Sequence, residues 1–315
     1  MTNFTPSLAL QAALVTEMAA ISAASLIGRG DEKAADQAAV DAMRNGLNAM
    51  PIRGRVVIGE GERDEAPMLY IGEEVGQGTG PEVDIALDPL EGTTITAKAM
   101  PNSLAVMSFA PRGCLLYAPD VYMQKLAVGP GYAPGIIDIN ASPADNVRAV
   151  AKAKGVAPDQ IGVCVLDRAR HASIIEELRS LNARVHLIMD GDVQGVINTT
   201  NPVSGVDLYM GSGGAPEGVL AASALRCIGG QIQGKLLFRN DDEVKRARRV
   251  GIDDLDAIYD IEGLAKGPTI FAATGVTNGT LVDGVRRESG KILTETLIMN
   301  SMDGSVQRLR STRDE

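Results

Sequence analysis

The stretch Val83-Asp84-Ile85-Ala86-Leu87-Asp88-Pro89-Leu90-Glu91-Gly92-Thr93-Thr94 joins a run of apolar residues to an acidic segment. Residues 83–87 are rich in β-branched and aliphatic side chains, which is typical of a strand. Pro89 restricts φ, so we expect a turn directly after that strand, and Gly92 allows the backbone to approach a ligand closely. The turn would present Asp88 and Glu91 three residues apart, an arrangement suited to holding one or two metal ions.

The same arrangement recurs along the chain, because acidic residues follow other predicted strands. Glu60 follows the apolar residues 56–58, and Asp190 follows a strand predicted over 185–189. Ligands of open α/β sheets collect outside the carboxyl ends of the strands. Carboxylates gathered there repel one another unless a cation neutralises them, and oxygen ligands without His or Cys favour Mg²⁺ or Mn²⁺ over zinc. One such acid alone would be interpreted as a solvated turn residue, but the repetition predicts a metal site.

Two helices are predicted before the first strand, over residues 6–28 and 34–50. On the second helix, Asp36 shares a face with Val40, Met43 and Leu47. A carboxylate on an apolar face is costly unless a cation is beside it. Asp36 is therefore a further candidate metal ligand.

The second half of the chain alternates strands and helices. Strands over 103–109 and 122–128 complete the first half; in the second half, strands are predicted over 161–166, 185–189 and 206–210, helices over 171–181 and 216–227, and a glycine-rich loop over 211–214. This alternation indicates an α/β fold with partly parallel strands. A shift in pattern near residue 140 predicts an N-terminal α+β subdomain, 1–140, with most of the metal ligands, and an α/β substrate-binding subdomain, 141–315.

Composition excludes several classes of function. The net charge of −10 and the aromatic content of 3% without Trp argue against nucleic acid and anionic membranes as partners. Three scattered cysteines do not make a disulfide framework or a zinc site, and they fit a reducing compartment. No secretory signal and no apolar stretch of bilayer length is evident. We therefore expect a cytoplasmic protein.

Five further segments and the acidic segment together resemble a known family. The segment 88–93 is similar to the D-P-[IL]-[DE]-G-T signature of the lithium-sensitive, metal-dependent phosphatases. Residues 30–36, 58–62, 166–171, 189–192 and 213–218 resemble, in the same order, the class II bacterial fructose-1,6-bisphosphatases. One departure is Glu32, where the family often has a lysine; here Lys33 follows it. We leave both residues out of the predicted catalytic set.

The resemblance implies a layered αβαβα sandwich of the sugar-phosphatase and inositol monophosphatase type. It implies hydrolysis of D-fructose 1,6-bisphosphate to D-fructose 6-phosphate and phosphate with Mg²⁺ or Mn²⁺, by a homodimer or homotetramer. The implied metal ligands are Asp36, Glu60, Asp88, Glu91 and Glu217, and the implied catalytic residues are Thr93, Glu60 and Asp88. The implied substrate contacts are Glu91, Gly92, Thr93, Tyr122, Arg168, Ala169, Arg170, Asp190, Gly191, Asp192 and Gly214.

Physical roles can be assigned to these residue types. Two cations about 3.5–4 Å apart could clamp the attacking and leaving oxygens of a phosphate ester, with Thr93 orienting the water. Arg168 and Arg170 offer donors for the phosphate that is not cleaved. The alternatives are a turn-capping threonine and solvated arginines. Activity on sedoheptulose 1,7-bisphosphate or an inositol phosphate stays open, as does a non-catalytic sugar-phosphate sensor.

Overall fold

The computed structural model describes residues 6–61 and 68–315, so Glu62 of the second family segment lies outside the described residues. The chain forms two compact units: the first comprises the residues up to Tyr117 together with Ala265–Glu315, and the second comprises Ala118–Leu264. This division differs from the predicted boundary at residue 140. The strand that begins at Tyr122 pairs inside the second unit, whereas the C-terminal segment returns to the first. Pairing between strands so distant in sequence leaves no local signal.

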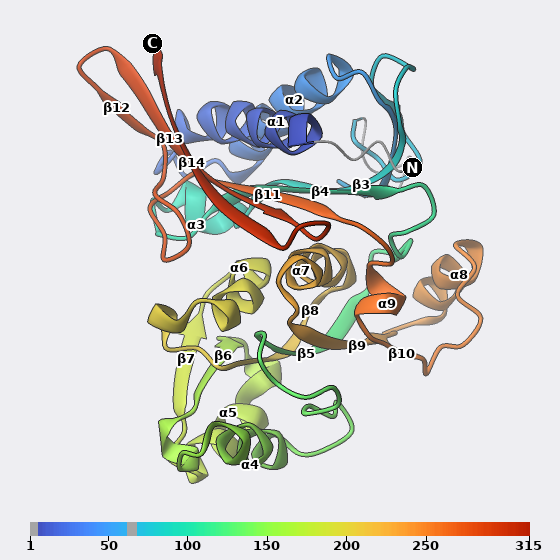
Figure 1. The fold of residues 1–315 in the computed structure, drawn as a ribbon, viewed down its shortest axis with the longest axis vertical. Coiled ribbons are helices and arrows are strands. Elements are labelled where there is room, and N and C mark those ends of the chain that lie inside the picture. Colours follow the sequence, from blue (N-terminus) through green and yellow to red (C-terminus); the bar gives the residue numbers. More distant parts are fainter. Residues whose placement is uncertain (1–5, 62–67) are drawn as a thin grey trace. The chain divides into compact units, whose positions relative to one another are not determined.

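The first unit is a mixed sheet covered by helices on one face (Figure 1). The sheet order is β12-β13-β11-β4-β3-β1-β2, with β14 also paired to β13, and β1 is parallel to β3. Its elements are α1 (Pro6–Ala24), α2 (Glu32–Asn48), β1 (Arg53–Ile58), β2 (Glu74–Val75), β3 (Glu82–Glu91), α3 (Thr93–Ala97), β4 (Leu104–Pro111), β11 (Ile270–Gly275), β12 (Arg286–Glu288), β13 (Lys291–Asn300) and β14 (Ser305–Asp314).

Helix α1 corrects the expectation that no apolar stretch reaches bilayer length. Within the described part of the chain, Ser7–Ala24 is long and apolar enough by composition to cross a membrane. However, 56% of this segment is buried inside the protein, where α1 packs on α2 and on strands β3, β4, β11 and β13. Its apolar residues therefore build the core between helix and sheet, which accounts for its hydropathy without a membrane.

Helix α2 begins where the Asp31 side chain accepts a hydrogen bond from the Ala34 amide at 3.0 Å, an N-cap interaction. Val40, Met43 and Leu47 are buried as predicted. Asp36, on the same face, is half-buried. The helix therefore carries a carboxylate at the margin of its apolar face.

The second unit is a sheet covered by helices on both faces, with α6 and α7 on one face and α4 and α5 on the other (Figure 1). The sheet order is β10-β9-β5-β8-β6-β7, in which β6 is parallel to β7 and β8 while β5 is antiparallel to β8 and β9. Its elements are β5 (Tyr122–Val128), α4 (Pro143–Lys154), β6 (Gly162–Leu166), α5 (Ala172–Ser180), β7 (Arg184–Ile188), α6 (Asp192–Ile197), β8 (Leu208–Gly214), α7 (Ala215–Ile228), β9 (Gln231–Leu237), α8 (Asp241–Arg249), β10 (Ile258–Tyr259) and α9 (Ile261–Leu264).

The predicted layered α/β class is confirmed, with two local corrections. Pro89 does not end its strand, because β3 continues to Glu91 with an irregularity in its pairing with β4 between Asp88 and Glu91. A proline is tolerated at such a bulge because no ladder hydrogen bond is required of it there. Similarly, residues 211–214 do not form a loop but the end of β8, paired to β5 up to Gly214.

Candidate active site

The acidic residues of the first unit meet at one edge of its sheet. Strands β1 and β3 are parallel, so Glu60, just beyond β1, and Asp88 and Glu91, at the end of β3, lie at the same edge. Ligand oxygens of Asp88 and Glu91 lie within 4.8 Å of each other. The Leu90 amide donates to Asp88 Oδ1 at 3.0 Å, which holds this carboxylate against the bulge. The acids that the strand-end rule selected in this unit therefore lie at one edge of the sheet.

Electrostatics bring Asp36 and Glu60 into the same group. Burial raises the pKa of Glu60 to about 9, and the charges of Asp88 and Asp36 add to the rise. Burial also raises the pKa of Asp36 above its ordinary value. A buried glutamate whose ionisation is opposed by two neighbouring carboxylates indicates a place for a positive charge. An all-oxygen donor set of this kind suits Mg²⁺ or Mn²⁺.

The backbone after Glu91 is held rigidly at the start of α3. Gly92 has φ 88°, in the left-handed region that favours glycine, and its carbonyl accepts from the Thr96 amide at 3.0 Å and from Thr96 Oγ1 at 3.1 Å. Ser103 Oγ donates to the Glu91 carbonyl at 3.0 Å. Thr93 is the first residue of α3 and half-buried. The Thr93 side chain is therefore attached to a backbone whose conformation is fixed, directly after Glu91 and Gly92.

In the second unit, the predicted substrate contacts also gather at one edge. The ends of β6, β7, β8 and β9 lie beside the start of β5, as the strand directions require. Tyr122 begins β5, Gly214 ends β8, residues 168–170 follow β6, and residues 190–192 follow β7. The structure therefore assembles in space four segments that lie far apart in the sequence.

Arg170 is fixed at this edge by β8 and by its neighbour His171. Its Nη2 donates to the Ser212 carbonyl at 2.8 Å, and its Nε donates to Ser212 Oγ at 3.1 Å. The imidazole of His171 accepts from the Ser212 amide through Nε2 at 2.8 Å, so Nδ1–H donates to the Leu166 carbonyl, also at 2.8 Å. Burial lowers the pKa of His171. This neutral histidine ties the end of β6 to β8.

Asp192 forms a buried ion pair that the sequence analysis missed. Lys125 Nζ lies 2.5 Å from Asp192 Oδ2, and the lysine side chain is 1% exposed. A Cβ atom at Gly213 would come within 2.1 Å of the same oxygen, so only glycine fits beside the pair. A lysine within the apolar residues 123–128 was the available sequence signal, because a buried cation requires a partner.

Glu217 lies in the first turn of α7, in the second unit, whereas the other four predicted metal ligands belong to the first unit. Its side chain folds back over Gly214, where an added Cβ would come within 2.0 Å of Glu217 Oε2. The glycine-rich end of β8 thus accommodates carboxylates, Asp192 beside Gly213 and Glu217 beside Gly214. Glycine is required at these two positions because the carboxylates lie where a Cβ would be.

Arg168 and Arg170 point to different places. Arg170 lies over the Tyr122 ring, 4.9 Å from its centroid, whereas Arg168 lines a hollow of about 390 Å³ that also contains Arg179 and Leu187. Arg239, two residues beyond β9, also lies 4.9 Å from the Tyr122 centroid. It was not predicted, since the strand before it was not recognised, although the same strand-end rule applies to it.

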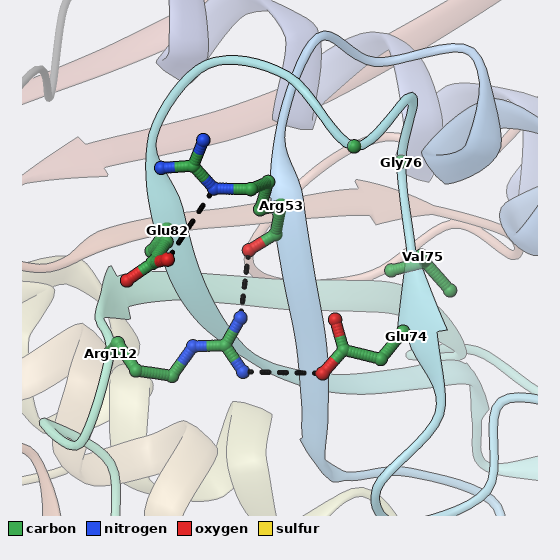
Figure 2. A pocket seen from close by; sticks show the side chains of 7 residues that line it. Arg53, Glu74, Val75, Gly76, Glu82 and Arg112 are labelled. Atoms are coloured by element: carbon green, nitrogen blue, oxygen red, sulfur yellow. Dashed lines mark hydrogen bonds and ion pairs between the residues drawn. The ribbon is translucent and has the colours of Figure 1, made fainter.

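A second hollow in the first unit, of about 430 Å³, is a weaker candidate for an anion site (Figure 2). Arg53 and Arg112 both line it, but Arg53 pairs with Glu82 at 3.4 Å and Arg112 with Glu74 at 3.7 Å. It lies where β1 begins, whereas Glu60 follows the end of that strand. Its charges are balanced by the protein itself.

Comparison with known proteins agrees with this geometry. The family described as "Bacterial fructose-1,6-bisphosphatase, glpX-encoded" matches residues 6–313. A protein of Prochlorococcus marinus (strain NATL1A) is 44% identical over 93% of this chain and 92% of its own length. One of Synechococcus sp. (strain JA-2-3B'a(2-13)) is 44% identical over 95% of this chain and 93% of its own. Both are named D-fructose 1,6-bisphosphatase class 2/sedoheptulose 1,7-bisphosphatase. The chain therefore belongs to the GlpX-type family of bacterial fructose-1,6-bisphosphatases.

Proposed function

We propose that this enzyme hydrolyses D-fructose 1,6-bisphosphate to D-fructose 6-phosphate and inorganic phosphate. Membership of the family over nearly the whole chain supports the proposal. The observation that carries it is the group of mutually repelling carboxylates at the edge of the first sheet, where Glu60 has a pKa of about 9. Such a group fits a phosphatase that needs a bound cation to neutralise an anionic substrate.

The proposed metal ligands are Asp36, Glu60, Asp88 and Glu91 of the first unit and Glu217 of the second. Mg²⁺ or Mn²⁺ fits them because every donor is a carboxylate oxygen. When bound, the cations would neutralise phosphate charge and lower the pKa of a coordinated water. The chain's part is to supply ionised carboxylates at fixed positions, which the bulge at Asp88 and the fixed backbone at Gly92 support.

Thr93 is the proposed catalytic hydroxyl, acting together with Glu60 and Asp88. A hydroxyl at the first position of α3 can accept from an attacking water while donating to a neighbouring carboxylate. That pair of hydrogen bonds would orient the water in line with the scissile bond. The rigid backbone of Glu91 and Gly92 limits the positions available to Thr93.

The sugar and the phosphate that is not cleaved are assigned to the second unit. Tyr122, Arg168, Ala169, Arg170, Asp190, Gly191, Asp192 and Gly214 are the proposed contacts there, joined by Glu91, Gly92 and Thr93 of the first unit. Arg170 supports this assignment best, since its guanidinium is already oriented by Ser212 and lies over Tyr122. The ion pair with Lys125 would hold the Asp192 carboxylate in place.

The direct test is phosphate release by the purified protein from fructose 1,6-bisphosphate, with Mg²⁺ or Mn²⁺ titrated against a chelator. We expect turnover that depends on the metal. Binding of the sugar phosphate without turnover would instead support a sensor, and release that persists with chelator would exclude the proposed site.

A dual activity on sedoheptulose 1,7-bisphosphate is the second candidate, because the relatives described above are named for both substrates. Comparing kcat/KM for the two bisphosphates and for an inositol monophosphate separates the possibilities. Comparable values for the two sugars would establish the dual enzyme, and preference for the inositol ester would overturn both.

We also propose that the enzyme acts in the cytoplasm as a homodimer or homotetramer. Free cysteines, with Cys164 and Cys227 buried, are compatible with a reducing compartment. Light scattering during size-exclusion chromatography measures the mass directly, and a monomer at assay concentrations would contradict the proposed assembly.

A further inference from the structure

Arg239 occupies a position that none of the predicted site residues shares. It follows β9, whereas Arg170 is attached to β8, and these strands lie on opposite sides of β5. Tyr122 begins β5 between them, and each guanidinium carbon lies 4.9 Å from the centre of its ring. The two arginines therefore flank one tyrosine. We call this group, Arg170, Tyr122 and Arg239, the arginine–tyrosine–arginine cluster.

Both arginines are anchored through the same edge of the guanidinium. Arg170 uses Nε and Nη2 on Ser212. Arg239 uses Nε, 2.6 Å from Glu243 Oε1, and Nη2, 2.5 Å from the same oxygen. Glu243 is fully buried, and its Oε2 also accepts from the Arg239 backbone amide at 2.7 Å. Among residues 6–61 and 68–315, neither guanidinium has a partner at Nη1, so this edge is left for an external acceptor.

The charges around the cluster make it suited to an anion. Glu243 offsets the charge of Arg239, and Asp120 acts on it from further away. The pKa of Arg239 is raised, mainly by its hydrogen bond to Glu243, so the guanidinium stays protonated. Arg170 makes its hydrogen bonds to the carbonyl and hydroxyl of Ser212, which are uncharged. A group with two guanidinium ions and one buried carboxylate in direct contact keeps a net positive charge on a chain of net charge −10.

We propose that Arg239 is a substrate-binding residue, and that the arginine–tyrosine–arginine cluster binds the phosphate of the bisphosphate that is not hydrolysed. This inference rests on the proposed function. Guanidinium groups bind phosphate through paired N–H donors, and two of them on fixed anchors recognise it with little loss of side-chain entropy. Arg239 thereby selects a bisphosphate over a monophosphate ester, since the second phosphate is present only in the former.

The test compares two substrates in the purified full-length enzyme with Mn²⁺. Arg239→Met should raise KM for fructose 1,6-bisphosphate by about 10- to 100-fold, the usual effect of losing a charge-assisted hydrogen bond. Its kcat should change little, and kcat/KM for p-nitrophenyl phosphate, which has no second phosphate, should stay at the wild-type value. Arg249→Met, the same change of charge at an exposed residue of α8, is the matched control and should affect neither substrate.

Three results would overturn the proposal. They are an unchanged KM for the bisphosphate, an equal loss on both substrates, and an equal effect of Arg249→Met. Calorimetric binding of fructose 6-phosphate keeps the test independent of the proposed function: if the wild-type protein shows no turnover, weaker binding in Arg239→Met than in Arg249→Met supports the cluster, and equal binding refutes it. Arg239→Lys should restore part of the affinity, because it keeps the charge but loses the planar donors.

Discussion

The two units solve opposite electrostatic problems. At the edge of the first sheet, burial and the charges of Asp88 and Asp36 raise the cost of ionising Glu60. At the edge of the second sheet, charges meet partners: Asp192 meets Lys125, and Arg239 meets Glu243. An external cation would relieve this repulsion at the first edge, whereas at the second edge these two charges are paired within the protein. This contrast supports the proposal that the first unit supplies most of the metal ligands and the second unit most of the donors to the phosphate that is not cleaved.

The largest expected effect is at the metal site. Asp88→Asn should lower turnover by at least about 100-fold, since losing even an outer partner of a metal ligand costs about 10- to 100-fold. Phosphate release at saturating Mn²⁺ measures it. Asp41→Asn, at an exposed residue of α2, should stay near the wild-type rate. A similar fall in Glu217→Gln would show that the second unit also supplies a ligand, while full activity of Asp88→Asn would remove the metal assignment.

Thr93→Val should lower kcat by about 100-fold, the lower range for losing a group that assists proton transfer, and should leave metal affinity unchanged. Mn²⁺ titration followed by calorimetry, beside the kinetic assay, separates the two quantities. Thr94→Val changes the neighbouring half-buried threonine and serves as the control. If metal affinity falls together with kcat, Thr93 supports the ligands rather than the water.

Glu60 predicts an unusual pH dependence of stability. Its pKa is about 9 in the folded, metal-free protein against an ordinary value of 4.5. Between these values the folded state holds a proton that the unfolded state has released, so the free energy of unfolding should fall as pH rises through the window. Metal binds the deprotonated carboxylate and therefore competes with that proton. The rise in Tm on adding Mn²⁺ should be larger at about pH 8 than at about pH 6, because less of that competing proton is present at the higher pH. Glu60→Gln should flatten the metal-free slope, and an unchanged slope would contradict the assignment.

The second unit should show the opposite, smaller slope. The pKa of His171 is lowered by burial from an ordinary value of 6.5, so its contribution to stability is present above that value and is lost as pH falls through the folded pKa. His171→Gln should lower the free energy of unfolding by about 1–3 kcal/mol at neutral pH, because buried partners lose hydrogen bonds. Urea unfolding of the wild-type protein and the variant at neutral and acidic pH measures the loss of unfolding free energy and its dependence on pH. An equal deficit at the two pH values would show that protonation of His171 is not involved.

The rule that ligands collect at strand ends located both edges from the sequence. The structure places Glu60 and Asp190 two residues beyond β1 and β7, and Asp88 within β3 near its end, because a strand and its following residues are neighbours in the chain. The rule was not applied to Arg239, because β9 was not recognised in the sequence. The two compact units divide the chain elsewhere than at residue 140, since β11 pairs with β4 across about half of the chain, and no local pattern records such a pairing.

Local sequence determined the α/β class, the strands that carry the acids, and the residue types at both edges, because periodicity and turn chemistry act over a few neighbouring residues. Only the tertiary structure decided which strand ends meet at one edge of a sheet, that Lys125 pairs with Asp192, and that Arg170 and Arg239 flank Tyr122. These contacts depend on strand order and on the packing of distant segments. The charge of a residue can be read from the chain, but its electrostatic surroundings exist only once the chain has folded.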